Sequence, residues 1–443
     1  MTPAGAATLL AGPHRSIAAL RRPCLVPRAP FAFSFPRSGA PNRGGPLRHP
    51  AAASRPGGGM SWRRGFGGMD HARTCRGTGD RHAVTTMYVN GKFVAQRTTG
   101  VQRVASCLVA ALDALLPRDA DWVLLCPPGH ATPTLRNIRV REVGWRGQSL
   151  HLWEQVCLPL AARRGRLLSL AGSAPLLARR AVALIHDAAV FDRPEAYAPL
   201  FRRWYRFLFR RLARRGTRLL TVSAFSRARL AHALAMDEGR IDVIPEGCDH
   251  LAGVGVDDRV LGRHGLRPGG YLLAVASDNP TKNLRGVVAA FGRRPSAVSA
   301  TLVIAGGRNE RVFAAGAAEG DPPGVVRTGP VSDGELKALY EQATALVFPS
   351  TYEGFGLPPL EAMACGCPVG ASNVASIPET CGDAALYFDP GSEAAMAAAM
   401  DRLLEDPALR DDLRRRGRAR AAEFPWAASA RALAATLAEE GRA

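Results

Sequence analysis

The segment STYEGFGLPPLEAMACGCPV, residues 350–369, gathers the residue types best able to do chemistry in this chain. Gly354 and Gly356 allow the backbone to approach a ligand closely, and a proline that suits a first helical turn follows them. The N-terminus of that helix directs unpaired N–H groups and a partial positive charge at the ligand, which favours a phosphate. Glu353 precedes the turn. Glu361 lies inside the first helical turn, where the helix dipole alone also favours an acid.

These groups need a scaffold, and the chain supplies short apolar strands that alternate with helical segments. MYVNGKF alternates like a strand, and Gly100 opens a helix. The strands that follow are WVLLCP, RLLSLAG, AVALIHDA, RLLTVS and IDVIPEG, and after a Gly-rich connector near 250–268 they are YLLAVAS, TLVIAGG, ALVFPS, CPVGAS and ALYFDP. A capping box, Ser332 with Glu335, begins one helix between the later strands. This rhythm predicts an α/β protein with two doubly wound, mostly parallel sheets.

Composition divides the chain further. Residues 1–86 hold 13 arginines and two acids, a net charge of +11 out of +20, and their Pro, Gly and Ala content predicts a disordered tail or an upstream start-site artefact. The predicted domains are 87–255 and 256–425. No uncharged apolar run is long enough to span a bilayer, and nine scattered cysteines indicate a reduced, cytoplasmic protein.

The spacing of Glu353 and Glu361 within EGFGLPPLEAMACGCPV closely resembles the donor-site signature of retaining GT-B glycosyltransferases of glycosyltransferase family 4. The resemblance covers most of residues 87–440. VASDNPTKNL, LVIAGG, GPVSDGELKALYEQATALVFPS and IPETCGDAALYFDP are similar to segments around the family's donor pocket, and TTGVQR, HDA, TVSAFSR and VIPEGCD follow the family's order in the first domain. Bacterial polysaccharide and mannosyltransferase members look closest.

The resemblance implies two Rossmann-like domains that face each other across a cleft, with the nucleotide-sugar donor in the second. It also implies that residues 426–443 form a helix that crosses back to the first domain, as in other GT-B enzymes. Lys282 would then bind the diphosphate, Glu353 would face the sugar hydroxyls, and Glu361 would accept from the ribose hydroxyls. The backbone amides of Gly354, Phe355 and Gly356 would hold the sugar and phosphate. The donor-binding set also includes Ser277, Leu357 and Gly100, the last a close-approach turn near the diphosphate.

In the first domain, His186 would hydrogen-bond the donor sugar near the reacting carbon. Asp187 either orients this ring or caps the next turn, and Arg103 and Ser223 are expected to support the site. The family needs no metal, and this chain has no DxD motif in a plausible loop, so positive groups must stabilise the departing diphosphate. Lys282 is one of only three lysines, but Thr281 stands where the family usually has arginine. The catalytic set is therefore His186, Glu353 and Lys282, with no metal and no cofactor.

The expected reaction is transfer of a hexose, with a weak preference for mannose, from a GDP- or UDP-linked donor to a glycan or lipid-linked acceptor in cell-surface polysaccharide synthesis. Anomeric configuration would be retained, with the acceptor hydroxyl attacking the face from which the diphosphate leaves.

The segment FRRWYRFLFRRLARRGTR, residues 201–218, holds eight arginines and five aromatics. Arg203, Arg206, Arg210 and Arg214 lie near one helical face. Either the segment contacts an anionic membrane surface, which would place the enzyme peripherally at the inner face of the cytoplasmic membrane, or its arginines are simply solvated. Two other functions stay open: a basic nucleic-acid-binding protein, and a non-catalytic glycosyltransferase homologue acting as a partner subunit. The sequence shows no recognisable nucleic-acid-binding motif, so we expect no nucleic-acid partner.

Overall fold

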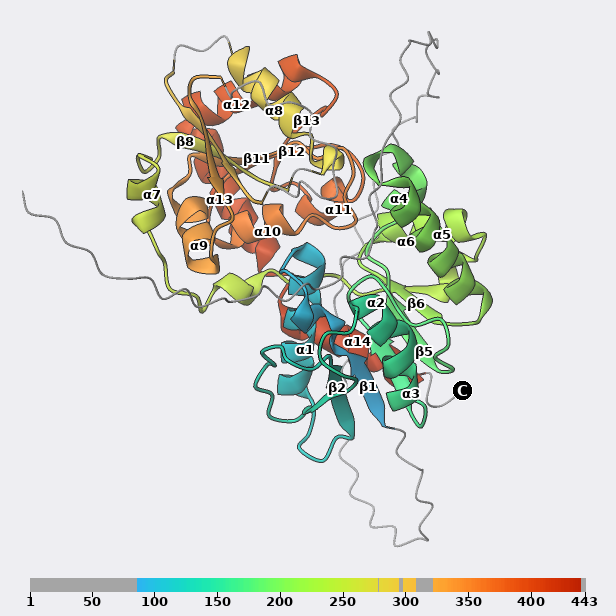
Figure 1. Ribbon diagram of the computed structural model, residues 1–443. Helices are drawn as coiled ribbons and strands as arrows, with labels where there is room; N and C mark the ends of the chain where they lie inside the picture. Colours follow the sequence, from blue (N-terminus) through green and yellow to red (C-terminus); the bar gives the residue numbers. More distant parts are fainter. Residues whose placement is uncertain (1–85, 278, 295–297, 308–321, 440–443) are drawn as a thin grey trace, which may run out of the picture. The chain divides into compact units, whose positions relative to one another are not determined.

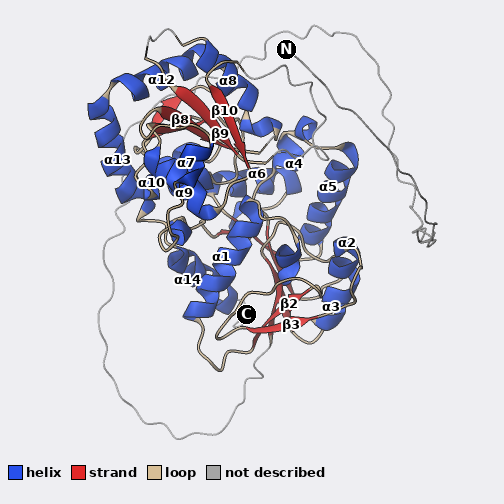
Figure 2. Cartoon of the chain, turned by 60° about the vertical axis from the view of Figure 1, so that its left-hand side comes forward, coloured by secondary structure: helices blue, strands red, loops and turns tan. Residues whose placement is uncertain are grey.

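A computed structural model describes residues 86–277, 279–294, 298–307 and 322–439 of the chain (Figure 1). The predicted N-terminal tail therefore falls outside the described residues, apart from Thr86 at its end. Within the described residues, two parallel sheets carry the fold, and helices pack on both faces of each (Figure 2). We call the first sheet with its helices the first lobe, and the second sheet with its helices the second lobe.

The first sheet has seven strands in the order β3-β2-β1-β4-β5-β6-β7, and every neighbouring pair is parallel. The strands are β1 (Met87–Asn90), β2 (Trp122–Cys126), β3 (Arg139–Glu142), β4 (Arg166–Ser169), β5 (Ala181–Leu184), β6 (Arg218–Thr221) and β7 (Ile241–Val243). Its helices are α1 (Gly100–Leu115), α2 (Leu150–Leu152), α3 (Leu158–Ala161), α4 (Ala189–Asp192), α5 (Pro199–Arg214) and α6 (Ala224–Leu234), and a π-helical turn, Trp153–Cys157, joins α2 to α3.

The second sheet has six parallel strands in the order β10-β9-β8-β11-β12-β13. They are β8 (Tyr271–Val275), β9 (Thr301–Ala305), β10 (Val325–Gly329), β11 (Ala345–Phe348), β12 (Val369–Ser372) and β13 (Leu386–Phe388). The remaining helices are α7 (Arg259–Arg263), α8 (Leu284–Gly292), α9 (Asp333–Gln342), α10 (Leu357–Ala364), α11 (Ile377–Cys381), α12 (Glu393–Glu405), α13 (Pro407–Ala421) and α14 (Trp426–Glu439).

Alternation along the central strands of the second sheet explains its two covered faces. Leu272 and Ala274 point to the face that α8 and α12 cover, while Tyr271 and Leu273 point to the face that α9 and α10 cover. All four side chains are fully buried. A parallel sheet buried on both faces reads as a continuous apolar run, which is why YLLAVAS was recognisable as a strand.

The sequence analysis places three elements differently from the structure. The first strand stops at Asn90, because the Asn90 side chain accepts from the Lys92 amide and turns the chain into a 3-10 helix, Gly91–Ala95. Strands β3 and β10 were not predicted. All four residues of β3 are exposed, and β10 is only half-buried, so neither gives the apolar signal of a central strand.

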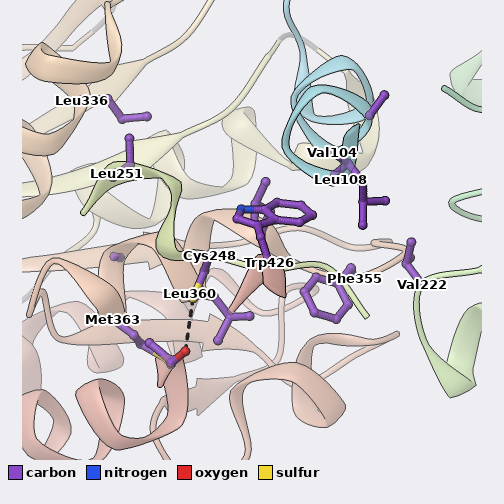
Figure 3. Packing of buried hydrophobic residues seen from close by; sticks show 14 of the residues in the cluster. Val104, Leu108, Val222, Cys248, Leu251, Leu336, Phe355, Leu360, Met363 and Trp426 are labelled. Carbon is purple, nitrogen blue, oxygen red and sulfur yellow. Dashed lines mark hydrogen bonds between the residues drawn. The ribbon is translucent and has the colours of Figure 1, made fainter. Parts of the chain in front are cut away.

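Trp426 begins α14 in the core that both lobes share. Figure 3 shows its indole close to Leu108 of α1, with Phe355 and Leu360 of the second lobe nearby, and all four belong to one buried cluster. Helix α14 packs along α1, so the end of the described chain belongs to the first lobe. Just before α14, the Phe424 carbonyl accepts a hydrogen bond from the Cys248 amide at 2.9 Å. This bond holds side by side the two passages between the lobes, the chain segments near residues 247–249 and 424–426.

Candidate active site

The predicted site residues lie in loops at the carboxyl ends of the strands. In the second sheet the strand order reverses between β8 and β11, and Lys282 and Glu353 follow those two strands. In the first sheet it reverses between β1 and β4. Gly100 follows β1, and His186 follows β5, the strand beside β4. Ligands of doubly wound sheets bind at such reversal points, so the topology brings these residues to the binding edges of both sheets.

Lys282 and Glu353 form an ion pair, with Nζ 2.6 Å from Oε1. The backbone joins their loops as well, because the Thr351 amide donates to the Thr281 carbonyl at 2.8 Å. The Lys282 and Glu353 side chains are 22% and 12% exposed, so a ligand can still reach them. An ammonium group has three donors, and the pair with Glu353 occupies one.

Hydroxyl groups hold three successive carbonyl oxygens of the loop before α10. Ser376 Oγ lies 2.9 Å from the carbonyl oxygens of both Glu353 and Phe355 and shares its one proton between them, and Thr380 donates to the Phe355 carbonyl at 2.6 Å. The Gly354 carbonyl lies 2.5 Å from Ser223 Oγ and 3.0 Å from Ser226 Oγ. In a trans peptide plane each carbonyl points opposite to the next N–H. The hydroxyls therefore turn the amides of Gly354, Phe355 and Gly356 the other way.

None of these three amides donates a hydrogen bond to another group in the described part of the chain. All three residues are nevertheless buried. Because buried backbone N–H groups are nearly always paired in native proteins, three successive unpaired ones at a helix N-terminus form a donor set suited to an anion or to sugar oxygens. Gly356 has φ +108°, which only glycine adopts without strain, and it serves as the N-cap of α10.

The His186 ring is held at both nitrogens. Nδ1 lies 3.2 Å from Glu246 Oε1, and Nε2 lies 3.1 Å from the Leu170 carbonyl oxygen. Asp187 does not orient the ring; its carboxylate accepts from the Ala189 amide at 2.8 Å and caps the turn that begins α4. Of the two roles expected for Asp187, the structure supports capping of the next turn. The side chain that contacts His186 belongs to Glu246, which the sequence did not single out.

Two acceptors on one imidazole set its protonation. Burial disfavours a charged His186 ring, but the Glu246 carboxylate and the Leu170 carbonyl outweigh burial and raise the pKa of His186. A neutral ring would leave one nitrogen lone pair facing an oxygen, so a proton must lie between Nδ1 and Oε1. His186 therefore holds a proton more tightly than a free imidazole does.

Glu361 is buried on α10 and has protein partners. Tyr340 on α9 donates its hydroxyl to Oε2 at 2.9 Å, and His250 Nε2 faces Oε1 at 3.0 Å. The expectation that Glu361 lies in the first helical turn is wrong by about one residue: α10 begins at Leu357, which places Glu361 in the second turn, away from the strongest part of the helix dipole.

The other predicted residues are less constrained. Ser277 and Gly100 are exposed, and a Cβ added at Gly100 would meet no atom within 4 Å. Leu357 is buried at the start of α10. Arg103 on α1 makes a two-point contact with Asp333 at the start of α9, at 2.5 and 3.0 Å, which joins the lobes as a supporting residue would.

Two family models match the chain: Glycosyltransferase Family 4 over residues 99–250 and Glycosyl transferases group 1 over residues 267–420. The O-antigen chain mannosyltransferase B of Escherichia coli is 36% identical over 256 residues, which are 56% of this chain and 67% of that protein. The chain belongs to glycosyltransferase family 4. It is a glycosyltransferase, as its motifs predicted.

Two further relatives of this glycosyltransferase have related names. The O-antigen chain mannosyltransferase RfbU of Salmonella typhimurium is 26% identical over 338 residues, 72% of this chain and 92% of that protein. The MMP alpha-(1->4)-mannosyltransferase of Mycolicibacterium hassiacum is 32% identical over 265 residues, 55% of this chain and 62% of that protein.

Solved structures agree on the architecture. The sucrose-phosphate synthase of Thermosynechococcus elongatus matches with a TM-score of 0.62 at 18% identity, covering 80% of this chain and 98% of that one. Anabaena HepE, solved in complex with UDP and glucose, matches with a TM-score of 0.62 at 17% identity, covering 80% and 100%. At these identities the likeness concerns the fold alone, and that fold is GT-B, as predicted.

Several residues of this glycosyltransferase site escaped sequence reasoning. Glu246, Tyr340 and Thr380 lie inside segments recognised as family-like, and Ser376 directly precedes one, but nothing in their spacing indicated which group they would touch. Arg97 had no signal at all. Its guanidinium lies over Gly307 in the loop after β9, where an added Cβ would overlap it.

Two further observations concern the described residues of the glycosyltransferase. A cavity of about 700 Å³ lined by residues 118–121 and 133–140 lies at the edge strand β3 and contains none of the predicted site residues. Among the residues that the structure describes, no helix is both long and apolar enough to cross a membrane.

Proposed function

We propose that this family 4 enzyme transfers a hexose, mannose preferred, from a nucleotide-sugar donor to a glycan or lipid-linked acceptor, with retention of anomeric configuration. One observation carries the proposal: the Lys282–Glu353 pair lies beside three successive unpaired amides at a strand-order reversal. Such a set can bind a diphosphate and a sugar at the same time, because it combines a cation, oriented N–H groups and a carboxylate.

The residues divide the donor between them. Lys282 and the amides of Phe355 and Gly356 would hold the diphosphate, and Glu353 would accept from sugar hydroxyls. Glu361 would accept from the ribose: its carboxylate offers about four acceptor positions, of which the Tyr340 hydroxyl uses one, and His250 Nε2 lies 3.0 Å from the other oxygen. Ser277, Gly100 and Leu357 would line the same donor.

The chemical step needs charge stabilisation rather than an enzymic base. As the diphosphate leaves, negative charge grows on its oxygens next to Lys282, which would stabilise it without a metal or a cofactor. The acceptor hydroxyl would attack the same face of the sugar and give its proton to a departing phosphate oxygen. Both His186 nitrogens have protein partners, Glu246 and Leu170, so in place of the expected hydrogen bond to the donor sugar the ring would lie beside the reacting carbon and shield that carbon from water.

The names of relatives support the biological setting. Mannosyltransferases of O-antigen chains are among them, so we propose a role in cell-surface polysaccharide synthesis, with GDP- or UDP-linked donors as candidates. HepE binds UDP, which keeps a uridine donor in the test. Family membership favours the enzyme over the nucleic-acid-binding alternative. The loop before α10, residues 353–356, which we call the donor loop, is intact and favours the enzyme over a non-catalytic subunit.

We further propose that α5 contacts an anionic membrane surface from the cytoplasmic side. Its solvent face carries Leu200 and Phe207, which are 68% and 53% exposed, among exposed arginines such as Arg203 and Arg211. The predicted arginine face needs one correction: Arg206 turns inward, where its guanidinium donates to the carbonyls of residues 190 and 191. Apolar side chains within a cationic surface suit the headgroup region of a bilayer.

The function is tested with the purified full chain and a panel of GDP- and UDP-sugars, by thermal stabilisation and by donor hydrolysis. At least one donor should bind and turn over. Lys282→Ala should lower kcat/KM for that donor by a factor of about 100 or more, because a cation at developing charge is lost. Lys337→Ala removes a lysine whose ammonium only bonds the Val254 carbonyl, so it should leave transfer near normal. Near-normal transfer by Lys282→Ala would disprove the assignment.

A further inference from the structure

The hydroxyls that hold the donor loop come from both lobes. Ser376 and Thr380, at the start of α11 and within it, belong to the second lobe, as the loop itself does. The Gly354 carbonyl is different, because its two partners, Ser223 and Ser226, lie at the start of α6 in the first lobe. The orientation of one peptide plane in the donor loop, the plane that carries the Phe355 N–H, therefore depends on the other lobe.

The contact between the lobes is close at this point. A Cβ on Gly354 would overlap the His186 carbonyl oxygen and lie 3.0 Å from the Asp187 Cβ, so only glycine lets the loop approach the first lobe this far. Ser226 Oγ also lies 3.0 Å from the His186 carbonyl. Ser223 and Ser226 are almost completely buried, at 1% and 0% exposure. These hydroxyls are thus enclosed between the lobes and not solvated.

A carboxylate fastens the same helix end to the second lobe. Glu379 of α11 accepts from the Ala224 amide at 2.7 Å and the Phe225 amide at 3.0 Å, the first two N–H groups of α6. An anion at a helix N-terminus is favourable. Helix α11 consequently bonds α6 through Glu379 and the donor loop through Ser376 and Thr380, which links all three segments in one joint.

We propose that Ser223 and Ser226 are positioning residues: they complete the donor loop across the lobe interface, so that the Phe355 amide faces the donor only when the lobes are in contact. The inference rests on the proposed function, because it assigns that amide to the donor of the same site. Preorganised N–H groups stabilise developing charge best when no reorientation is needed during the reaction. Contact between the lobes then places the Phe355 N–H where it stabilises the transition state, in addition to closing the site.

The deciding experiment compares Ser226→Ala and the double variant Ser223→Ala/Ser226→Ala with the wild-type full chain. With the best donor of the panel, kcat should fall about tenfold or more in the double variant, while the Kd of the nucleoside diphosphate alone changes by less than about twofold. That split follows because Lys282 and the Gly356 amide, which Ser223 and Ser226 do not orient, still hold the diphosphate alone. The Phe355 amide contributes most in the transition state, where negative charge grows on the leaving diphosphate. Ser226→Thr keeps a hydroxyl and should recover part of the lost kcat.

Ser392→Ala is the matched control for a lost helix cap. Ser392 caps α12 through the Ala395 amide, as Ser223 caps α6 through the Ser226 amide, but it lies outside the joint. This control should lose thermal stability without the loss of kcat. A double variant with kcat within about twofold of wild type would overturn the inference, as would a loss explained by the unfolded fraction alone.

Hydrogen exchange gives a readout that does not depend on turnover. With saturating nucleoside diphosphate, peptides that span 353–356 should exchange faster in the double variant than in the wild type or in Ser392→Ala. The Gly354 carbonyl has then lost the partners that turn the Phe355 N–H toward the ligand, so the ligand no longer protects that N–H. Unchanged exchange there would refute the positioning role even if no donor were turned over. A wild-type chain that binds no nucleotide sugar would instead refute the proposed function.

Discussion

Three carboxyl groups lie around Lys282 and His186 where the lobes meet, and they differ in burial. Glu353 pairs with Lys282 and stays partly accessible, whereas Glu246 is 6% exposed beside His186. Burial raises the pKa of Glu246, and its hydrogen bond with His186 opposes that shift. Burial also raises the pKa of Asp187, which the Ala189 amide partly offsets. Burial thus disfavours the ionised forms of Glu246 and Asp187.

The His186–Glu246 contact predicts a change in a measurable pKa. In Glu246→Gln the negative partner is gone and burial of the ring dominates, so the pKa of His186 should fall below the ordinary value of about 6.5. The wild-type ring should instead keep its proton until pH rises above that value. Imidazole NMR of isotope-labelled full chain, assigned with a His186→Gln variant, measures both. Equal His186 pKa values in the wild type and Glu246→Gln would contradict the geometry.

Arg97 predicts a second cation for the diphosphate. It is exposed beside Gly307, and Gly306 touches Ala276 at the start of the loop that carries Lys282. Since Thr281 lacks the usual positive charge, Arg97→Ala should weaken nucleoside diphosphate binding about tenfold and monophosphate binding much less. Calorimetric titration of both nucleotides measures the difference. Arg118→Ala, an exposed arginine in the turn before β2, is the control; equal losses in the two variants would mean that only net charge matters.

At this scale the sequence reached the residues but not their partners. The Lys282 and Glu353 motifs were recognisable, yet their ion pair joins loops 71 positions apart in the chain. Glu246 and Arg97 act through contacts between segments remote in sequence, and no local spacing encodes such contacts. The roles of His186, Glu361 and the other predicted residues remain predictions.

Secondary-structure elements were predicted well where local chemistry decides them. The capping box of Ser332 and Glu335 begins α9 as expected, because both of its hydrogen bonds are local. The exposed edge strand β3 escaped prediction, since its pairing with β2 is not written in its own residues. Helix α5 lies between these cases: its amphipathic pattern was visible, but which arginines bond carbonyls depends on the segment against which it packs.

The solvent face of α5 makes a prediction at the level of the element. Leu200→Ser/Phe207→Ser should reduce sedimentation of the full chain with vesicles that contain anionic phosphatidylglycerol, because it removes the apolar contact and keeps every arginine. Leu160→Ser changes a comparably exposed leucine on α3 and should have no effect. Equal binding to neutral and anionic vesicles, or no change in the double variant, would contradict the membrane assignment.

At the scale of the molecule, Trp426 ties the two lobes into one core. It is 5% exposed, its amide donates to Asp249 at 2.8 Å, and its indole N–H donates to His250 Nδ1 at 3.3 Å. The other ring nitrogen, Nε2, lies 3.0 Å from Glu361 Oε1. The start of α14 is therefore linked through one histidine to a predicted donor-binding carboxylate.

Trp426→Ala should cost about 3–5 kcal/mol of unfolding free energy, through lost burial and a cavity at the lobe junction. Urea denaturation followed by circular dichroism measures the cost, and loss of coupling between the lobes should appear as a broader or two-step transition. Trp145→Ala, in which the tryptophan is 56% exposed, should change stability by about 0.5 kcal/mol at most. A Trp426→Ala variant as stable as wild type would place the junction elsewhere.

The paired passages near residues 247–249 and 424–426 also have a mechanical consequence. Two lobes that are connected by a single chain segment can twist relative to each other as easily as they bend. Here two chain segments connect the lobes side by side, bonded through the Cys248 amide and the Phe424 carbonyl. Gly247 has no room for a side chain against Trp426. Two such segments side by side let the lobes bend about one axis and resist torsion between them. The lobes should therefore open and close by a hinge motion about one axis, which returns Ser226 to Gly354 at each closure.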